Sequence, residues 1–187
     1  MKRFLKVTSI LLIALIIIYL SGPTFPKPSY SKDLPSIQIP TSEADSFIKK
    51  KEANLKIKPD NESRIIWANE SLKNKTEYCL LYIHGFSASW FEGEPVHRDF
   101  AHRYAMNLYI PRLASHGIDT TEVLINMTPE RLYESAKEAL VIAQSLGKKV
   151  ILMSTSTGGT LSLKLAAEFP QLVEGLILYS PNVAINN

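Results

Sequence analysis

The feature that most constrains the fold is a regular alternation of short apolar runs with amphipathic segments. Four runs are rich in aliphatic and aromatic residues throughout, which is typical of strands buried on both faces. They are residues 78–83, 108–110, 150–153 and 176–179. Helical patterns lie between them, at residues 96–105, 129–146 and 161–169. Strands that alternate with helices predict βαβ units with right-handed crossovers. We therefore expect an α/β fold, with a mostly parallel sheet and helices on both faces.

Residues 1–22 have the composition of an export signal. Lys2, Arg3 and Lys6 precede an apolar stretch at residues 7–20, and the export machinery recognises segments with this order. We interpret residues 1–22 as an uncleaved signal anchor, because no small-residue cleavage site is evident. A removable signal peptide is the alternative, since the stretch is shorter than the roughly 20 residues of a membrane span. The positive flank predicts that the remainder lies outside the cytoplasm, membrane-anchored or, after cleavage, secreted or periplasmic.

Residues 23–60 are expected to form a proline-rich tether and a short helix. The five prolines between positions 23 and 40 favour an extended chain. From Thr41 to Glu52 the sequence predicts a helix with a Ser or Thr cap and acidic residues in its first turn. The globular domain then occupies residues 61–187. Its clearest helix start is Thr128, because a proline at the first helical position follows the capping hydroxyl.

The distribution of charge argues against a nucleic-acid-binding protein. Residues 1–60 carry ten Lys or Arg and five Asp or Glu, whereas residues 61–187 carry eleven and thirteen. The globular part therefore lacks the basic surface that phosphate binding requires. The single cysteine, Cys79, lies in an apolar run, which predicts a buried, unreactive thiol. No cluster of Cys and His has the spacing of a metal site, and we expect neither a metal nor a cofactor.

Two strand ends carry residues that predict chemistry. In residues 154–158 (Ser-Thr-Ser-Thr-Gly), Ser156 stands on a tight strand-to-helix turn that pushes its hydroxyl out of the sheet. Ser156 is the candidate nucleophile. At the other strand end, Gly85 permits a sharp turn that would aim the Phe86 N–H at the same place. With the N–H of Thr157, it would form a two-donor oxyanion hole. Either motif alone is also found as an ordinary turn or helix cap, whereas their joint placement favours a catalytic site.

These motifs resemble those of the α/β-hydrolase superfamily. The resemblance covers about residues 60–187 and is carried by Ile-His-Gly-Phe at 83–86, by residues 111–117 and by residues 153–159. It implies a serine hydrolase of the esterase or lipase kind, in which a small ester-like substrate acylates Ser156. It also implies that His116 shapes a loop and is not the catalytic base.

The loop after Phe86 has two interpretations. Trp90, Phe91, Glu92 and Glu94 either line the mouth of a pocket or belong to a surface loop with one buried aromatic side chain.

The resemblance also implies residues that this sequence does not offer. In that family the nucleophile is followed along the chain by an acid and then by a histidine. The acidic residues that follow Ser156 are Glu168 and Glu174 alone, and all four histidines precede it. We therefore expect a chain truncated after the nucleophile turn and the next strand, and inactive or nearly so by itself. A non-catalytic hydrolase-like binding module and a membrane-anchored interaction protein are the alternatives.

Overall fold

A computed structural model describes residues 2–22 and 26–183, so positions 23–25 of the predicted tether and the end of the chain at 184–187 lie outside the described residues. The described residues form five α-helices and five strands, and from β2 onward strands and α-helices alternate. The helices are α1 (Lys2–Leu20), α2 (Ala44–Glu52), α3 (Val96–Arg103), α4 (Pro129–Leu146) and α5 (Thr157–Glu168). The strands are β1 (Arg64–Ile66), β2 (Thr76–Ile83), β3 (Asn107–Ile110), β4 (Gly147–Thr155) and β5 (Gly175–Tyr179). Short 3₁₀ turns are Thr41–Glu43, η2 (Trp90–Gly93) and Pro170–Leu172.

The strands form one sheet in the order β1-β3-β2-β4-β5. Only the pairing of β1 with β3 is antiparallel, and the other three pairings are parallel. The predicted α/β fold with a mostly parallel sheet is thereby confirmed. The register of β2 and β4 runs from Thr76 beside Gly147 to Ile83 beside Ser154. The two strands therefore end side by side, and the loops that follow them start at the same edge.

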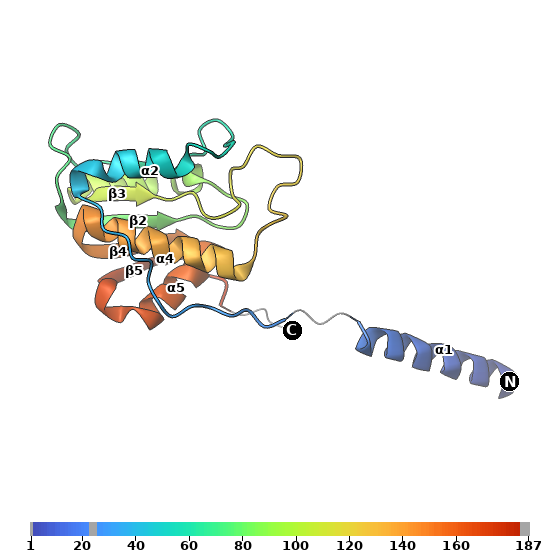
Figure 1. Cartoon of the computed structure of the whole chain (residues 1–187). Coiled ribbons are helices and arrows are strands. Elements are labelled where there is room, and N and C mark those ends of the chain that lie inside the picture. The colour runs from blue at the N-terminus through green and yellow to red at the C-terminus, as the bar shows by residue number, and fades with distance from the viewer. Residues whose placement is uncertain (1, 23–25, 184–187) are drawn as a thin grey trace.

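Helices cover both faces of the sheet. Figure 1 shows α2, α4 and α5 on one face, where they share a large apolar core with the strands. The second core is smaller and lies on the opposite face, where α3 packs against β2 and β3. Cys79 on β2 is fully buried, and burial raises the pKa of its thiol. The prediction of a buried thiol is therefore confirmed.

Two threonines, Thr128 and Thr41, show how tertiary contacts modify the helix caps that the sequence predicts. Thr128 caps α4 as predicted, because its hydroxyl accepts the N–H of Arg131. Thr41 does not cap its own helix. Its hydroxyl instead donates to the carbonyl of Ser145 in the last turn of α4, where carbonyls lack partners within the helix. The expected Ser or Thr cap at this helix is thus wrong: α2 begins at Ala44 with no side-chain cap.

The extended segment before α2 is fastened to α4. Lys137 of α4 is fully buried, and its ammonium donates to the carbonyls of Ser31 and Asp33 at 3.0 and 2.8 Å. Tyr30 packs edge-on against Tyr133 with ring centroids 5.4 Å apart. Figure 1 shows this segment running alongside α4. Residues 29–34 are thus packed against the surface of the domain.

Helix α1 is long and apolar enough to cross a membrane. None of its described residues is buried. Its position near the N-terminus and its composition suit a membrane span or a signal sequence equally.

Candidate active site

Ser156 lies at the junction of β4 and α5, in a backbone conformation that few residues adopt. Its φ is 52° and its ψ is −117°, outside the regions that are favourable for residues with a Cβ. The turn is held in place by the N–H of Ser156, which donates to the carbonyl of Tyr179 on β5 at 2.9 Å, and by the N–H of Thr160, which donates to the carbonyl of Ser156. The predicted tight strand-to-helix turn is present, and Ser156 is half-buried at its apex.

Small residues around the turn allow three segments to meet. A methyl group on Gly158 would lie 2.6 Å from the carbonyl oxygen of His84 and still closer to that of Ile83. A methyl group on Gly159 would lie 2.7 Å from Cβ of Pro181, just after β5. Ser154, at the position where the pattern expects a small residue, is fully buried. The pattern around Ser156 is therefore a packing requirement as well as a motif.

The loop after β2 comes close to this turn. A methyl group on Gly85 would lie 3.4 Å from Cβ of Ser156, so the loop at 84–88 and the serine are neighbours. The side chain of Phe86 is exposed. Its N–H has no hydrogen-bond partner among residues 2–22 and 26–183. Thr157 is the first residue of α5, where the helix leaves its N–H groups without internal partners. Thr157 thus follows Ser156 in the chain, and Phe86 follows Gly85, which lies next to Ser156 in space.

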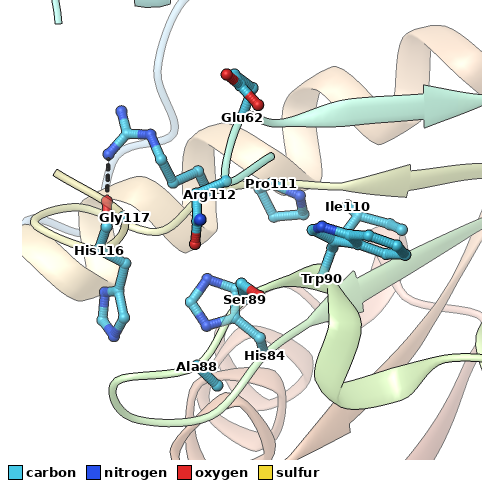
Figure 2. A pocket seen from close by; sticks show the side chains of 11 residues that line it. Glu62, His84, Ala88, Ser89, Trp90, Ile110, Pro111, Arg112, His116 and Gly117 are labelled. Carbon is cyan, nitrogen blue, oxygen red and sulfur yellow. Dashed lines mark hydrogen bonds between the residues drawn. The ribbon is translucent and has the colours of Figure 1, made fainter. Parts of the chain in front are cut away.

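Two buried histidines support the loop. The imidazole rings of His84 and His116 lie edge to face, with centroids 4.8 Å apart. Nε2 of His84 accepts the N–H of Leu113 at 3.3 Å, and Nε2 of His116 accepts the N–H of Ser87 at 3.1 Å. In Figure 2, both rings and Arg112 surround a small pocket, and Arg112 donates to the carbonyl of His116. The structure agrees with a loop-shaping role for His116.

Both of these imidazoles are held in the neutral form. An Nε2 that accepts a backbone N–H leaves the proton on Nδ1, and Nδ1 of His84 lies 2.9 Å from the carbonyl of Gly85. Burial lowers the pKa of His84 to about 4, against a smaller opposing effect of that hydrogen bond. Burial also lowers the pKa of His116.

The two acids that follow Ser156, and the buried His97, are engaged elsewhere. Glu168 bonds to Lys164 and to the hydroxyl of Tyr133, and Glu174 pairs with Lys149. His97 is buried against the ring of Tyr82, with its Nε2 2.9 Å from the carbonyl of Trp90. In the part of the chain that the structure describes, none of these side chains bonds to Ser156, and no group of three His, Cys, Asp or Glu is placed to hold a metal.

The loop that follows Phe86 contains a residue that lines a pocket and residues that lie at the surface. Trp90 lines the pocket of Figure 2 and stacks under the guanidinium of Arg64, 4.0 Å from the ring centroid. Phe91 is exposed. Glu94 forms an ion pair with Arg98 at 2.7 Å. Glu92 turns back toward Gly85 and accepts its N–H at 2.7 Å.

Asn182 is a neighbour of Ser156 that the sequence patterns did not identify. Its side-chain Nδ2 donates to Oγ of Ser156 at 3.0 Å. Its carbonyl accepts the hydroxyl of Thr160 at 2.6 Å, which fixes the segment after β5 against α5. The one available signal was its place just after a strand that ends at the same edge of the sheet as β4.

Several solved structures have a fold similar to that of this chain. One from work on LipS and LipT, two metagenome-derived lipolytic enzymes, is 20% identical, with a TM-score of 0.60 over 70% of this chain and 50% of its own. Est1E from Butyrivibrio proteoclasticus, with ferulic acid bound, is 17% identical, with a TM-score of 0.50 over 64% and 48%. An α/β-hydrolase enzyme from lagoon sediments of Mar Chica, Morocco, is 18% identical, with a TM-score of 0.47 over 68% and 52%.

The first two of these similarities establish the fold. The chain has the α/β-hydrolase fold, as the resemblance in its motifs implied, and it spans about half the length of the solved structures that it matches. No protein-family model and no curated protein sequence matches it.

Proposed function

We propose that this chain carries the nucleophile and the oxyanion hole of a serine hydrolase that cleaves small carboxylic esters. The observation that supports it most directly is the strained backbone of Ser156, with φ 52° and ψ −117°, on a turn packed against the loop of Phe86. Backbone strain of about 1–3 kcal/mol persists only where the surroundings fix it, and it concentrates at functional sites. The lipolytic function named for one similar structure, and the carboxylic acid bound to another, agree with an ester substrate.

In the proposed reaction, Oγ of Ser156 attacks the ester carbonyl and forms a tetrahedral intermediate. Its oxyanion accepts hydrogen bonds from the N–H groups of Phe86 and Thr157, and the positive end of the α5 dipole favours the same charge. Expulsion of the alcohol leaves an acyl group on Ser156, and attack by water then releases the acid. Asn182 Nδ2 donates a hydrogen bond to the nucleophilic oxygen of Ser156. When substrate enters, the Asn182 side chain would either move away or help to hold Oγ in place.

The proposal requires a histidine and an acid that activate Ser156. We propose that they come from outside residues 1–187. His84, His97 and His116 are buried in other contacts, and His102 lies on α3 beside Met106, which precedes the start of β3. On this view the 187-residue chain by itself reacts slowly or not at all.

A fluorophosphonate probe tests this proposal. The probe is added to the 187-residue chain, to the protein made from the complete reading frame, and to a Ser156→Ala variant of each. We expect labelling that depends on Ser156 in the complete protein and little or none in the short chain. Rapid labelling of the short chain would contradict the external histidine. An unreactive Ser156 in the complete protein would favour a non-catalytic binding module or a membrane-anchored interaction protein.

We further propose that α1 is a signal anchor that holds the domain outside the cytoplasm. Its apolar length and the flanking Lys2, Arg3 and Lys6 support this orientation. The mass of the protein recovered from membranes tests it: retention of residues 1–22 is expected, and a shortened, soluble product would show that a signal peptide is removed.

A further inference from the structure

Glu92 makes contacts that an ordinary surface glutamate does not make. It belongs to η2 and is an exposed residue, yet its carboxylate turns back onto the end of β2. One oxygen, Oε2, accepts both the N–H of Gly85 at 2.7 Å and the hydroxyl of Tyr82 at 3.1 Å. The other oxygen lies where a methyl group on Gly85 would approach it to 2.8 Å. The carboxylate therefore covers Gly85 directly.

The same contacts continue to the turn of Ser156. The hydroxyl of Tyr82 lies 3.1 Å from the hydroxyl of Thr155, the residue immediately before Ser156. Tyr82 is fully buried, so its hydroxyl has a fixed position at the edge of the sheet. A chain of hydrogen bonds thus runs from Gly85 through Glu92 and Tyr82 to Thr155.

These contacts hold the backbone on one side of the Phe86 amide. On the other side, the N–H of Ser87 is held by Nε2 of His116 at 3.1 Å. The amides before and after Phe86 are therefore both fixed, and the N–H of Phe86 between them is free for an acceptor from outside the loop. An oxyanion donor must be placed to within a fraction of an ångström before the reaction begins, because its value lies in preorganisation.

We propose that Glu92 is a positioning residue that sets the Phe86 N–H in register with Ser156. This inference rests on the proposed function, since it assigns a task to Glu92 only if Phe86 is an oxyanion donor. A charged acceptor suits the task, because hydrogen bonds to a carboxylate are shorter and stronger than those to a neutral oxygen. Glu92 itself does not contact the reacting atoms, so its removal should lower kcat and leave KM nearly unchanged.

The test compares Glu92→Ala with Glu94→Ala in protein made from the complete reading frame, with p-nitrophenyl acetate as substrate. Glu94 is the matched control, because it lies two residues further on and pairs with Arg98 at the surface. We expect Glu92→Ala to lower kcat by about 10- to 100-fold with KM within about twofold, since loss of a whole oxyanion donor costs about 10²–10³. Glu94→Ala should change kcat less than about threefold, as surface ion pairs contribute little.

A second readout does not depend on turnover. Selective ¹⁵N-glycine labelling of the same protein limits its amide spectrum to the glycines, of which residues 1–187 contain eight. In Glu92→Ala the Gly85 amide proton should move upfield and exchange faster with solvent, whereas Glu94→Ala should leave it in place. An unchanged Gly85 resonance, or equal kcat in the two variants, would overturn the proposal.

Failure of the proposed function gives a different pattern. If Ser156→Ala retains the activity of the parent protein, the nucleophile assignment is wrong, whatever Glu92→Ala does. If Glu92→Ala does not fold, Tyr82→Phe decides, because it removes only the hydroxyl between Glu92 and Thr155. A severalfold lower kcat at unchanged KM supports the proposal, and an unchanged kcat contradicts it.

Discussion

Replacement of Gly158 by alanine should destabilise the domain strongly, because the backbone at the end of β2 leaves no room for a methyl group there. The added carbon would lie 2.6 Å from the carbonyl oxygen of His84, 2.8 Å from the carbonyl carbon of Ile83 and closer still to the oxygen of Ile83. Ordinary van der Waals contacts are about 3.5 Å. All of these atoms belong to the backbone at the end of β2, so no side-chain rotation can relieve the overlap.

The magnitude follows from the displacement that is needed. Either α5 or the end of β2 must move by about 1 Å, and forced overpacking of this kind costs about 3 kcal/mol. Alanine is favoured over glycine in a helix by at most about 1 kcal/mol, which offsets part of the cost. We therefore expect the free energy of unfolding to fall by about 2–3 kcal/mol, a factor of about 30 to 160 in the ratio of folded to unfolded protein.

Gly175→Ala is the matched control for this measurement. At Gly175 on β5 the nearest atom to an added methyl group is Cγ1 of Ile151, at 4.0 Å, which is an ordinary contact. The control should change the free energy of unfolding by less than about 1 kcal/mol. Urea titrations of the chain in mild detergent, followed by the fluorescence of the buried Trp67, compare the two variants. Equal stabilities would refute the close packing inferred at the turn.

Three further predictions concern strain, the fastened N-terminal segment and pH. Ser156→Gly should be more stable than Ser156→Ala by about 1–2 kcal/mol in the same titration, because glycine adopts φ 52° without strain; equal stabilities would contradict the strain. Lys137→Met should free residues 29–34 from α4 and so speed tryptic cleavage after Lys32 at least about fivefold. Lys149→Met, which alters an exposed ion pair, should leave the cleavage rate unchanged. Because the pKa of His84 is lowered to about 4 from an ordinary 6.5, the unfolded chain binds more protons between these values. Stability should therefore be full above pH 6.5 and fall by on the order of 3 kcal/mol as the pH drops to 4, and His84→Asn should flatten this dependence in urea titrations at each pH.

The strands, the helices and the turn at Ser156 could be predicted because each is written in consecutive residues. Continuous apolar runs gave the positions of β2 to β5 to within a few residues, and Thr128 with Pro129 marked the start of α4. The ends of the strands were harder to predict. The helical pattern expected at residues 129–146 ends just before Gly147, where β4 begins. The sheet requires a glycine at this position, because a methyl group would lie 2.6 Å from Cβ of Cys79 on the neighbouring strand. Such a requirement comes from the sheet and leaves no local signal.

Contacts between distant segments could not be predicted, even where they decide the role of a charged residue. Lys137 lies on α4 among residues with helical spacing, and a lysine is rarely buried. Its burial depends on carbonyls of Ser31 and Asp33, more than a hundred positions earlier. Likewise, no feature of the sequence distinguishes the role of Glu92 from that of Glu94. Only the fold turns one toward Gly85 and the other toward Arg98.

The two motifs that predicted a site are parts of one packed unit, which explains why their joint occurrence was informative. Without a Cβ, Gly158 leaves room for the carbonyls of Ile83 and His84. Without a Cβ, Gly85 leaves room for the carboxylate of Glu92 beside Ser156. Each glycine therefore makes space for the partner loop and not for its own turn alone. A turn with a serine needs neither glycine in order to cap a helix. A turn that must bring its serine next to the loop after a neighbouring strand needs both.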